Sequence, residues 1–123
     1  MKIAVFTKST SLHKNHGGLE TQNLVLCEEL AKRGYNITVF SPKKELQEEF
    51  AEKNGVKYVF IDADYRNYLF SKFRKNSWGK KSLEVFSEWQ RRENFDIVLS
   101  QSAAAEKIIE KKHELNVKTV SIA

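Results

Sequence analysis

Short runs of apolar residues alternate along the chain with longer segments in which apolar residues recur every three or four positions. The runs are almost uninterrupted, as at 58–61 (YVFI) and 97–99 (IVL), which is typical of parallel strands buried on both faces. The longer segments carry an apolar stripe, such as Leu24, Cys27 and Leu30, which predicts amphipathic helices. The pattern therefore predicts an α/β protein in which strands and helices alternate.

The same pattern sets approximate element boundaries. We expect strands at 2–7, 36–40, 57–61, 96–100 and 117–122. We expect helices at 18–33, 43–54, 80–93 and 103–115. Because crossovers between parallel strands are right-handed, this order predicts a single Rossmann-like domain over residues 1–123. Its fold would be a three-layer α/β/α sandwich around a parallel sheet with strand order 3-2-1-4-5.

Glycine, proline and serine mark the expected helix ends. Gly34 and Gly55 each follow a helical pattern and suit the left-handed position just beyond a helix. Pro42 suits the first turn of the helix expected at 43–54. Ser102 can accept hydrogen bonds from the free N–H groups of the turn that follows it.

Composition narrows the class of protein. Hydrophobic residues make up 41% and charged residues 30% of the chain, a globular rather than disordered balance. No apolar run approaches the roughly 20 residues needed to cross a bilayer, and the charged start does not resemble a signal peptide. Cys27 is the only cysteine, so no internal disulfide can form, and its helical spacing indicates a core position. We therefore expect a cytoplasmic location.

The net charge of +5 permits an acidic partner but does not choose between phosphate, nucleic acid and anionic lipid. The segment 65–81 concentrates this charge: six basic residues are interleaved with five aromatic residues, and no acid is present. It could dock on an anionic membrane surface with Phe73 or Trp78 at the interface, or contact nucleic acid by stacking. Alternatively, it packs its aromatic side chains inward and leaves its charges in solvent.

The most informative loop follows the first strand. Gly17 and Gly18 open the first helix, where a backbone without Cβ atoms can approach a ligand closely and unpaired N–H groups suit a phosphate. An ordinary strand-to-helix turn would need the same glycines. Ser100, Gln101 and Ser102 end the fourth expected strand, which lies beside the first at the point where the strand order reverses. We therefore expect these polar side chains to face the same crevice as Gly17.

Other kinds of site fit poorly. The G-x-G-x-x-G spacing of dinucleotide-binding loops is absent, and the second strand ends in Ser41 and Pro42 rather than in an acid. His13 and His16 have no suitably spaced third ligand, so we expect no metal site. No arrangement of nucleophile and base can be argued from spacing, so we assign no catalytic residue.

Several motifs together resemble the N-terminal, acceptor-side domain of family-4 glycosyltransferases with the GT-B architecture. They are the opening strand at 1–5, the GGLE sequence at 17–20, the LAKRGYNITV sequence at 30–39, FDIV at 95–98 and VKTVSI at 117–122. The matches run from the first residue nearly to the last, but the middle of the chain carries no family signature.

The resemblance implies a two-domain enzyme that transfers a sugar from a nucleotide-sugar donor to a sugar or lipid-linked acceptor, without a metal or bound cofactor. It implies that Gly17 and Gly18 approach the donor diphosphate and that Glu20 belongs to the same motif. His16 flanks this loop and is a further candidate for ligand contact. The family often has histidines where this chain has Ser100, Gln101 and Ser102. The family's C-terminal donor domain has no counterpart in these residues, so we expect no sugar transfer by this chain alone.

Three hypotheses of function follow. The chain is the acceptor-binding half of a glycosyltransferase, a stand-alone nucleotide- or phosphate-binding module, or an interaction domain that docks through 65–81 on a membrane or partner. We expect no nucleic-acid partner, and expect 65–81 to bind anionic surfaces weakly, which would place the protein at the inner face of the membrane. We also expect the strand at 117–122 to be an exposed edge that pairs with a second copy.

Overall fold

The computed structural model describes residues 1–7, 18–43, 49–63, 77–101 and 104–122, with only the backbone at 18–24. Its sheet contains β1 (Lys2–Phe6), β2 (Asn36–Pro42), β3 (Phe50–Lys53), β4 (Val56–Ile61), β5 (Ile97–Gln101) and β6 (Lys118–Ile122). The strand order is β3-β4-β2-β1-β5-β6. All neighbours are parallel except β3, which pairs antiparallel with β4. The five parallel strands confirm the predicted order, and β3 extends one edge.

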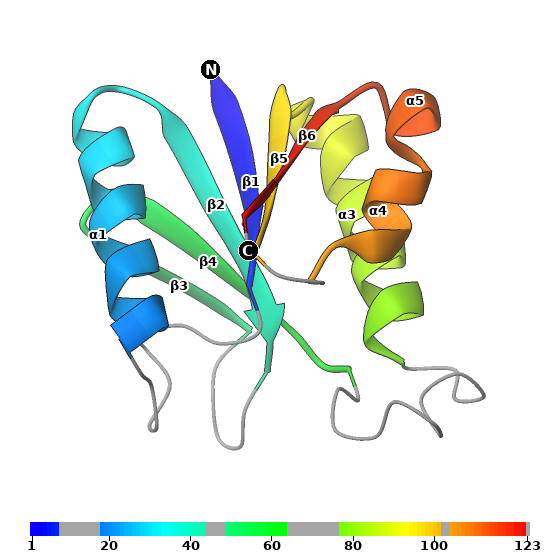
Figure 1. Cartoon of the computed structure of the whole chain (residues 1–123), viewed down its shortest axis with the longest axis horizontal. Coiled ribbons are helices and arrows are strands. Elements are labelled where there is room, and N and C mark those ends of the chain that lie inside the picture. Colours follow the sequence, from blue (N-terminus) through cyan, green and yellow to red (C-terminus); the bar gives the residue numbers. More distant parts are fainter. Residues whose placement is uncertain (8–17, 44–48, 64–76, 102–103, 123) are drawn as a thin grey trace.

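The helices lie on both faces of this sheet. They are α1 (Gly18–Lys32), α3 (Trp78–Glu93), α4 (Glu106–Glu110) and α5 (Lys112–Leu115). Figure 1 shows α1 on one side and α3, α4 and α5 on the other, which confirms the three-layer sandwich. We call these two sides of the sheet the α1 face and the α3 face.

The helix predicted over 43–54 is wrong for the part of it that the structure describes. Residues 49–54 lead through β3 into a hairpin with β4, in which Phe50 pairs with Val59 and Lys53 with Val56. Asn54 and Gly55 form the turn with φ angles of 52° and 81°. Two successive left-handed residues are typical of the tight turn that matches strand twist, and Asn-Gly is its strongest signal. Gly55 therefore closes a hairpin rather than a helix, and Pro42 ends β2 instead of starting a helix.

Other helix ends follow the predicted chemistry more closely. Gly34 has a φ of 95°, and the N–H groups of Gly34 and Tyr35 donate to the carbonyls of Ala31 and Leu30. This Schellman pattern confirms the predicted end of α1. The helix expected at 103–115 begins later, at Glu106, and is divided at Lys111 into α4 and α5.

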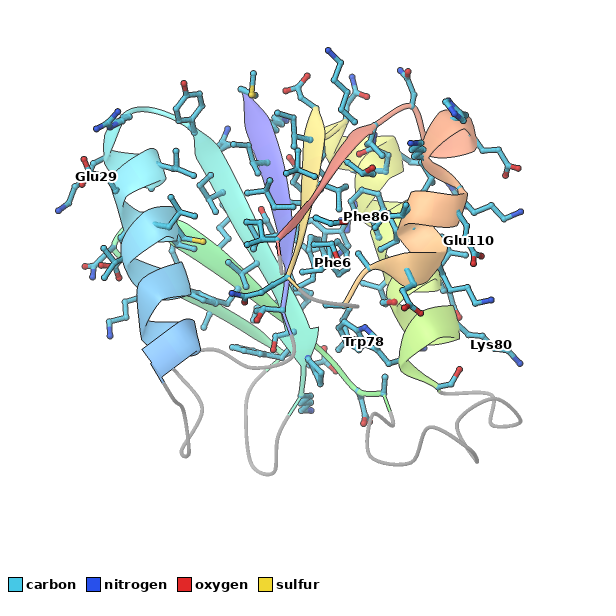
Figure 2. All side chains as sticks on the ribbon, viewed as in Figure 1. Phe6, Glu29, Trp78, Lys80, Phe86 and Glu110 are labelled. Carbon is cyan, nitrogen blue, oxygen red and sulfur yellow. The ribbon has the colours of Figure 1, made fainter. Side chains whose placement is uncertain are left out.

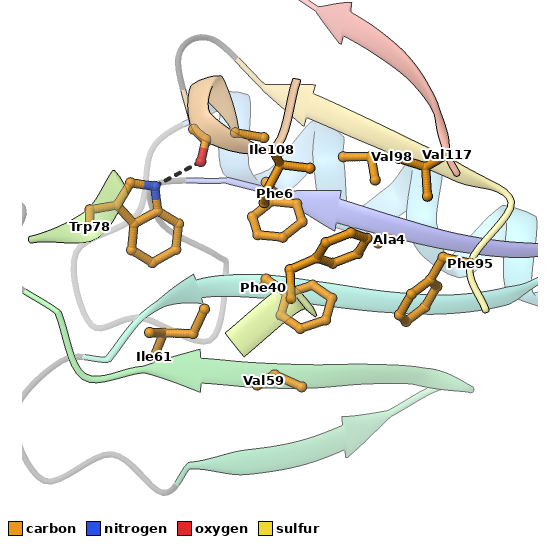
Figure 3. Close-up of a cluster of buried hydrophobic side chains, with 13 residues drawn as sticks. Ala4, Phe6, Phe40, Val59, Ile61, Trp78, Phe95, Val98, Ile108 and Val117 are labelled. Atoms are coloured by element: carbon orange, nitrogen blue, oxygen red, sulfur yellow. Dashed lines mark hydrogen bonds between the residues drawn. The ribbon is translucent and has the colours of Figure 1, made fainter. Parts of the chain in front are cut away.

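The core of the α3 face is aromatic (Figure 3). Phe6 and Phe40 stack with ring centroids 4.8 Å apart, and Phe86 of α3 meets them edge-on at 5.6 and 6.0 Å. All three side chains are fully buried. Such pairs add to the large hydrophobic contribution of burying each ring, so this cluster helps to hold α3 to the sheet.

A buried glutamine joins three segments at the end of α3. The side-chain amide of Gln90 donates to the carbonyls of Phe95 and Leu115, and its Oε1 accepts a 2.7 Å hydrogen bond from the N–H of Phe95. These bonds satisfy backbone groups where α3 leads into β5 and where α5 ends, positions that regular hydrogen-bond ladders do not serve.

The α1 face has a mainly aliphatic core that also contains the stacked pair Tyr58 and Phe60, and within the described residues it is less completely covered. Its buried cluster includes Val5, Val39, Cys27 and Tyr58, and α1 packs over β2 and β4. Along β6, Val120 lies beside Leu99 on this face and is 48% exposed. Apolar side chains therefore remain in solvent at the β6 edge of the α1 face.

Candidate functional site

Three buried polar residues lie side by side where the central strands end. Ser41 lies near the end of β2, Thr7 directly follows β1, and Gln101 ends β5. The register pairs Phe6 with Phe40 and with Ser100, so the next position on each strand forms one row across the sheet. We call Ser41, Thr7 and Gln101 the polar row.

Alternation along each strand places the polar row on the α1 face. Val5 and Val39 belong to the cluster under α1, and Thr7 and Ser41 each lie two residues further along. The neighbouring row on this face contains Val39, Val5 and Leu99 and is entirely apolar. Polarity therefore appears abruptly at the carboxyl ends of the strands, where open α/β sheets bind ligands.

A short hydrogen bond joins the two strands at the reversal of strand order. Thr7 Oγ1 donates to Gln101 Oε1 over 2.7 Å, with both residues buried. The backbone N–H of Thr7 donates to the carbonyl of Phe40 at 3.1 Å. Ser41 is fully buried, and its Oγ has no hydrogen-bond partner within the described part of the chain. An unsatisfied buried hydroxyl is unusual in a folded protein, and it indicates that the polar row has a role besides packing.

Ser100 and Gln101 point to opposite faces of the sheet, although both were expected to face the crevice. Val98, two residues before Ser100, belongs to the α3-face core. Consistent with this, Ser100 Oγ accepts a 3.1 Å hydrogen bond from the N–H of Ala105, just before α4. Ser100 thus helps to begin α4, the role the sequence suggested for Ser102, which lies outside the described residues.

The first helix begins at the same end of the sheet as the polar row (Figure 1). Gly18 is its first residue and Glu20 lies in its first turn. The side chain of Glu20 is outside the described part, as are Gly17 and His16 entirely. The start of α1 offers unpaired N–H groups and the positive end of its dipole to this end of the sheet.

Thr7 and Ser41 were not among the candidate site residues, although the sequence carried a signal for both. Each is the first polar residue after an uninterrupted apolar run, AVF at 4–6 and VF at 39–40. Side chains alternate between the two faces of a sheet, so residues at equivalent positions of two adjacent parallel strands lie on the same face. The apolar runs predict where the strands end and hence the positions of Thr7 and Ser41, but they do not predict the hydrogen bond between Thr7 and Gln101.

The aromatic-basic segment is described only from Ser77 onward. Trp78 is 6% exposed, and its Nε1 donates to the carbonyl of Ala104 over 2.7 Å (Figure 3). This aromatic ring therefore packs inward and does not sit at a membrane interface. Lys80 extends away from Trp78 into solvent (Figure 2), and Lys81 Nζ lies 3.8 Å from a carboxylate oxygen of Glu84.

Within the described residues, no group of three His, Cys, Asp or Glu side chains is placed to hold a metal ion. Cys27 is 1% exposed, and burial, with a smaller effect from Glu28, raises the pKa of its thiol to about 12. It is therefore a protonated core residue, as its spacing predicted. Among the described helices, none is long and apolar enough to cross a bilayer.

A hollow of about 450 Å³ lies at the other end of the sheet from the polar row. Residues near the starts of β1, β5 and β6 line it, including Met1, Asp96 and Lys118. It is thus separate from the crevice that the sequence predicts.

Comparison with known proteins identifies the family and the fold. The family model described as Glycosyltransferase Family 4 matches residues 16–122. A search of curated proteins finds no match. A solved structure of sucrose-phosphate synthase from Thermosynechococcus elongatus is similar to 98% of this chain, with a TM-score of 0.79 and 16% identity. A second structure of that enzyme gives a TM-score of 0.63 and 14% identity over 100% of this chain.

The chain spans 32% of the first sucrose-phosphate synthase chain and 64% of the second. At these identities the likeness establishes the fold, a Rossmann-like domain of the kind that forms the N-terminal half of GT-B enzymes. The family match extends over most of the described strands and helices. The chain therefore belongs to family 4 of the glycosyltransferases.

Proposed function

We propose that this chain forms the acceptor-side half of a glycosyltransferase, which transfers a sugar from a nucleotide-sugar to a sugar or lipid-linked acceptor. The observation that carries the proposal is the polar row. In a member of this family, three buried polar side chains lie where the strand order reverses, at the end of the sheet where α1 begins. Neutral hydroxyl and amide groups at such a position suit a hydroxyl-rich ligand.

Each candidate residue has a role in this proposal. Gly17, Gly18, Glu20 and His16 lie at or before the start of α1, whose positive end favours the donor diphosphate. Gln101 and Ser102 face the acceptor, and Ser100 supports them by beginning α4. None of these residues is assigned a catalytic role, because a leaving diphosphate needs donors preorganised on both sides of the cleft.

Nuclear magnetic resonance of the 123-residue chain tests the location of binding. Glucose, glucose 6-phosphate and UDP-glucose are titrated separately; the sugar phosphate is included because the structural neighbour is named for a phosphorylated sugar product. We expect amide shifts at Thr7, Ser41 and Gln101, and none at Asn116 in the hollow at the opposite end. Shifts confined to that hollow would contradict the proposal.

Turnover gives a second test. We expect the chain alone to release no sugar from UDP-glucose with any of these acceptors, for the reason given above. A matched variant with Gly17 and Gly18 replaced by alanine sets the background. Turnover above that background would show that one half suffices and would overturn this part of the proposal.

We also propose that basic residues near α3 hold the protein weakly at an anionic membrane surface, where a lipid-linked acceptor would lie. The first turn of α3 contains Lys80 and Lys81 and no acidic residue. Co-sedimentation with vesicles containing phosphatidylserine should be seen at low salt and lost at high salt, because screening acts within roughly 10 Å at 0.1 M. Binding that persists after both lysines are replaced by glutamine would contradict this role for them.

A further inference from the structure

The side-chain amide of Gln101 has its two ends in different surroundings. Oε1 accepts the 2.7 Å hydrogen bond from Thr7. The Nε2 group donates to no described residue, and Gln101 retains 8% exposure at the end of β5. Thr7 is 3% exposed and Ser41 is fully buried, so within the polar row Gln101 is the residue with the most access to solvent.

We propose that Thr7 is a positioning residue, which fixes the amide of Gln101 so that its Nε2 donates a hydrogen bond to a ligand hydroxyl. An amide group is planar, so engaging Oε1 with Thr7 turns the two Nε2 hydrogens away from β1. Without Thr7 the amide could rotate and present its oxygen instead. The inference rests on the proposed function for the nature of the ligand, but not for the orientation of the amide.

The chemistry of the row indicates a neutral, hydroxyl-rich ligand group, such as a sugar ring. The row consists of two hydroxyls and one amide and contains no charge. A site of this kind rejects analogues that cannot accept its hydrogen bond, because the buried donor would then be left unpaired. Thr7 therefore contributes to specificity through Gln101 without touching the ligand.

Four variants separate the effect of orienting the Gln101 amide from the effect of side-chain packing. Thr7→Val keeps the shape of the side chain but removes the hydroxyl, and Thr7→Ser keeps the hydroxyl. Gln101→Glu keeps an acceptor for Thr7 but lacks the Nε2 donor, and Gln101→Met removes both polar ends. A urea melt of each variant checks that it folds.

The first readout needs no ligand. In the unmodified chain the Nε2 hydrogens of Gln101 should have chemical shifts displaced from those of a free glutamine amide and nuclear Overhauser contacts that fit one orientation, because Thr7 holds Oε1. Thr7→Val should move these chemical shifts towards the free values, and Thr7→Ser should keep them near their original positions. Unchanged Gln101 resonances in a folded Thr7→Val chain would overturn the positioning role.

The second readout is titration with glucose, followed by the chemical shift of the backbone amide at position 101, which every variant retains. We expect Thr7→Val, Gln101→Glu and Gln101→Met each to weaken binding about tenfold, the effect of one lost hydrogen bond, and Thr7→Ser to stay within about twofold. If the chemical shifts of Gln101 change with glucose 6-phosphate but not with glucose, the ligand is not a neutral sugar and the proposed ligand class is wrong. If sugars change chemical shifts elsewhere but not at Gln101, then Gln101 does not contact the ligand, and the proposed function still stands. If no sugar or nucleotide-sugar binds, the proposed function and the ligand contact both fail, and the first readout still decides the role of Thr7.

Discussion

The two faces of the sheet differ in chemistry and in how completely helices cover them. On the α3 face, Phe6, Phe40 and Phe86 are fully buried under α3, and Gln90 ties the end of that helix to two other segments. On the α1 face, α1 covers a mainly aliphatic cluster with Tyr58 and Phe60 over β2 and β4, the polar row follows it, and apolar residues of β6 are exposed. We therefore expect stability to be concentrated on the α3 face, and we propose that ligands and partners bind on the α1 face.

The largest expected effect comes from the aromatic core. Phe86→Ala should lower the free energy of unfolding by about 3–5 kcal/mol, because it removes a fully buried ring and leaves a cavity against Phe6 and Phe40. Val120→Ala on the α1 face is the matched control and should change it by less than about 0.5 kcal/mol, as expected for an exposed site. Urea melts measure both, and equal losses would contradict the comparison.

Gln90→Leu should cost about 2 kcal/mol or more, because it leaves the N–H of Phe95 and the carbonyls of Phe95 and Leu115 without their partner. Hydrogen exchange of the Phe95 amide should accelerate more than that of Val5 on the α1 face. If exchange rises equally at both sites, Gln90 acts on global stability alone rather than on this junction.

The β6 edge predicts association on the less covered side. Lys118–Ile122 lies at one edge of the described sheet and presents Val120 and Ile122 at 48% and 39% exposure. We expect two copies to pair through antiparallel β6 strands, which would satisfy both edges about a two-fold axis. Sedimentation equilibrium should show a dimer at high concentration and a monomer for Val120→Lys. A monomer at every concentration would show that this edge is protected.

The buried thiol under α1 predicts a loss of stability at alkaline pH. Cys27 has a pKa of about 12 in the folded chain against 9.0 for an ordinary thiol, so its contribution is fully present below pH 9. It is lost as the pH rises from 9 towards 12, because the unfolded chain then releases the proton and the folded chain does not. Burial raises the pKa of Tyr58 in the same sense. Melts over this range should show a smaller loss for Cys27→Ala, and an identical loss would exclude the thiol as a contributor.

The smallest effect concerns the polar row itself. Ser41→Ala should leave stability within about 0.5 kcal/mol or raise it slightly, because the hydroxyl that it removes has no described partner to lose. Thr7→Val, one strand away, should instead cost about 1 kcal/mol for its hydrogen bond to Gln101. A clear loss for Ser41→Ala would show that its hydroxyl is engaged in the folded chain.

Alternation between apolar runs and helical stripes was enough to predict the five parallel strands, their order and α1. It failed at 49–54, where a segment of helix-forming residues is converted to a strand by the Asn54–Gly55 turn and by pairing with β4. Tertiary pairing of this kind overrides weak helix propensity. At the site, Gln101 was identifiable from its place at a strand end, but its bond to Thr7 depends on the register of strands distant in the sequence.

The pairing of β1 with β5 also has a consequence for synthesis. Thr7 and Gln101 are 94 positions apart, so translation at 5–20 residues per second separates their appearance by roughly ten seconds. During that interval β1 can pair with β2 and pack under α1, but α3 is incomplete and Phe6 and Phe40 remain uncovered. We expect the nascent chain to expose this aromatic surface until α3 is complete and can pack on the sheet, and to depend on chaperone binding there more than the finished domain does.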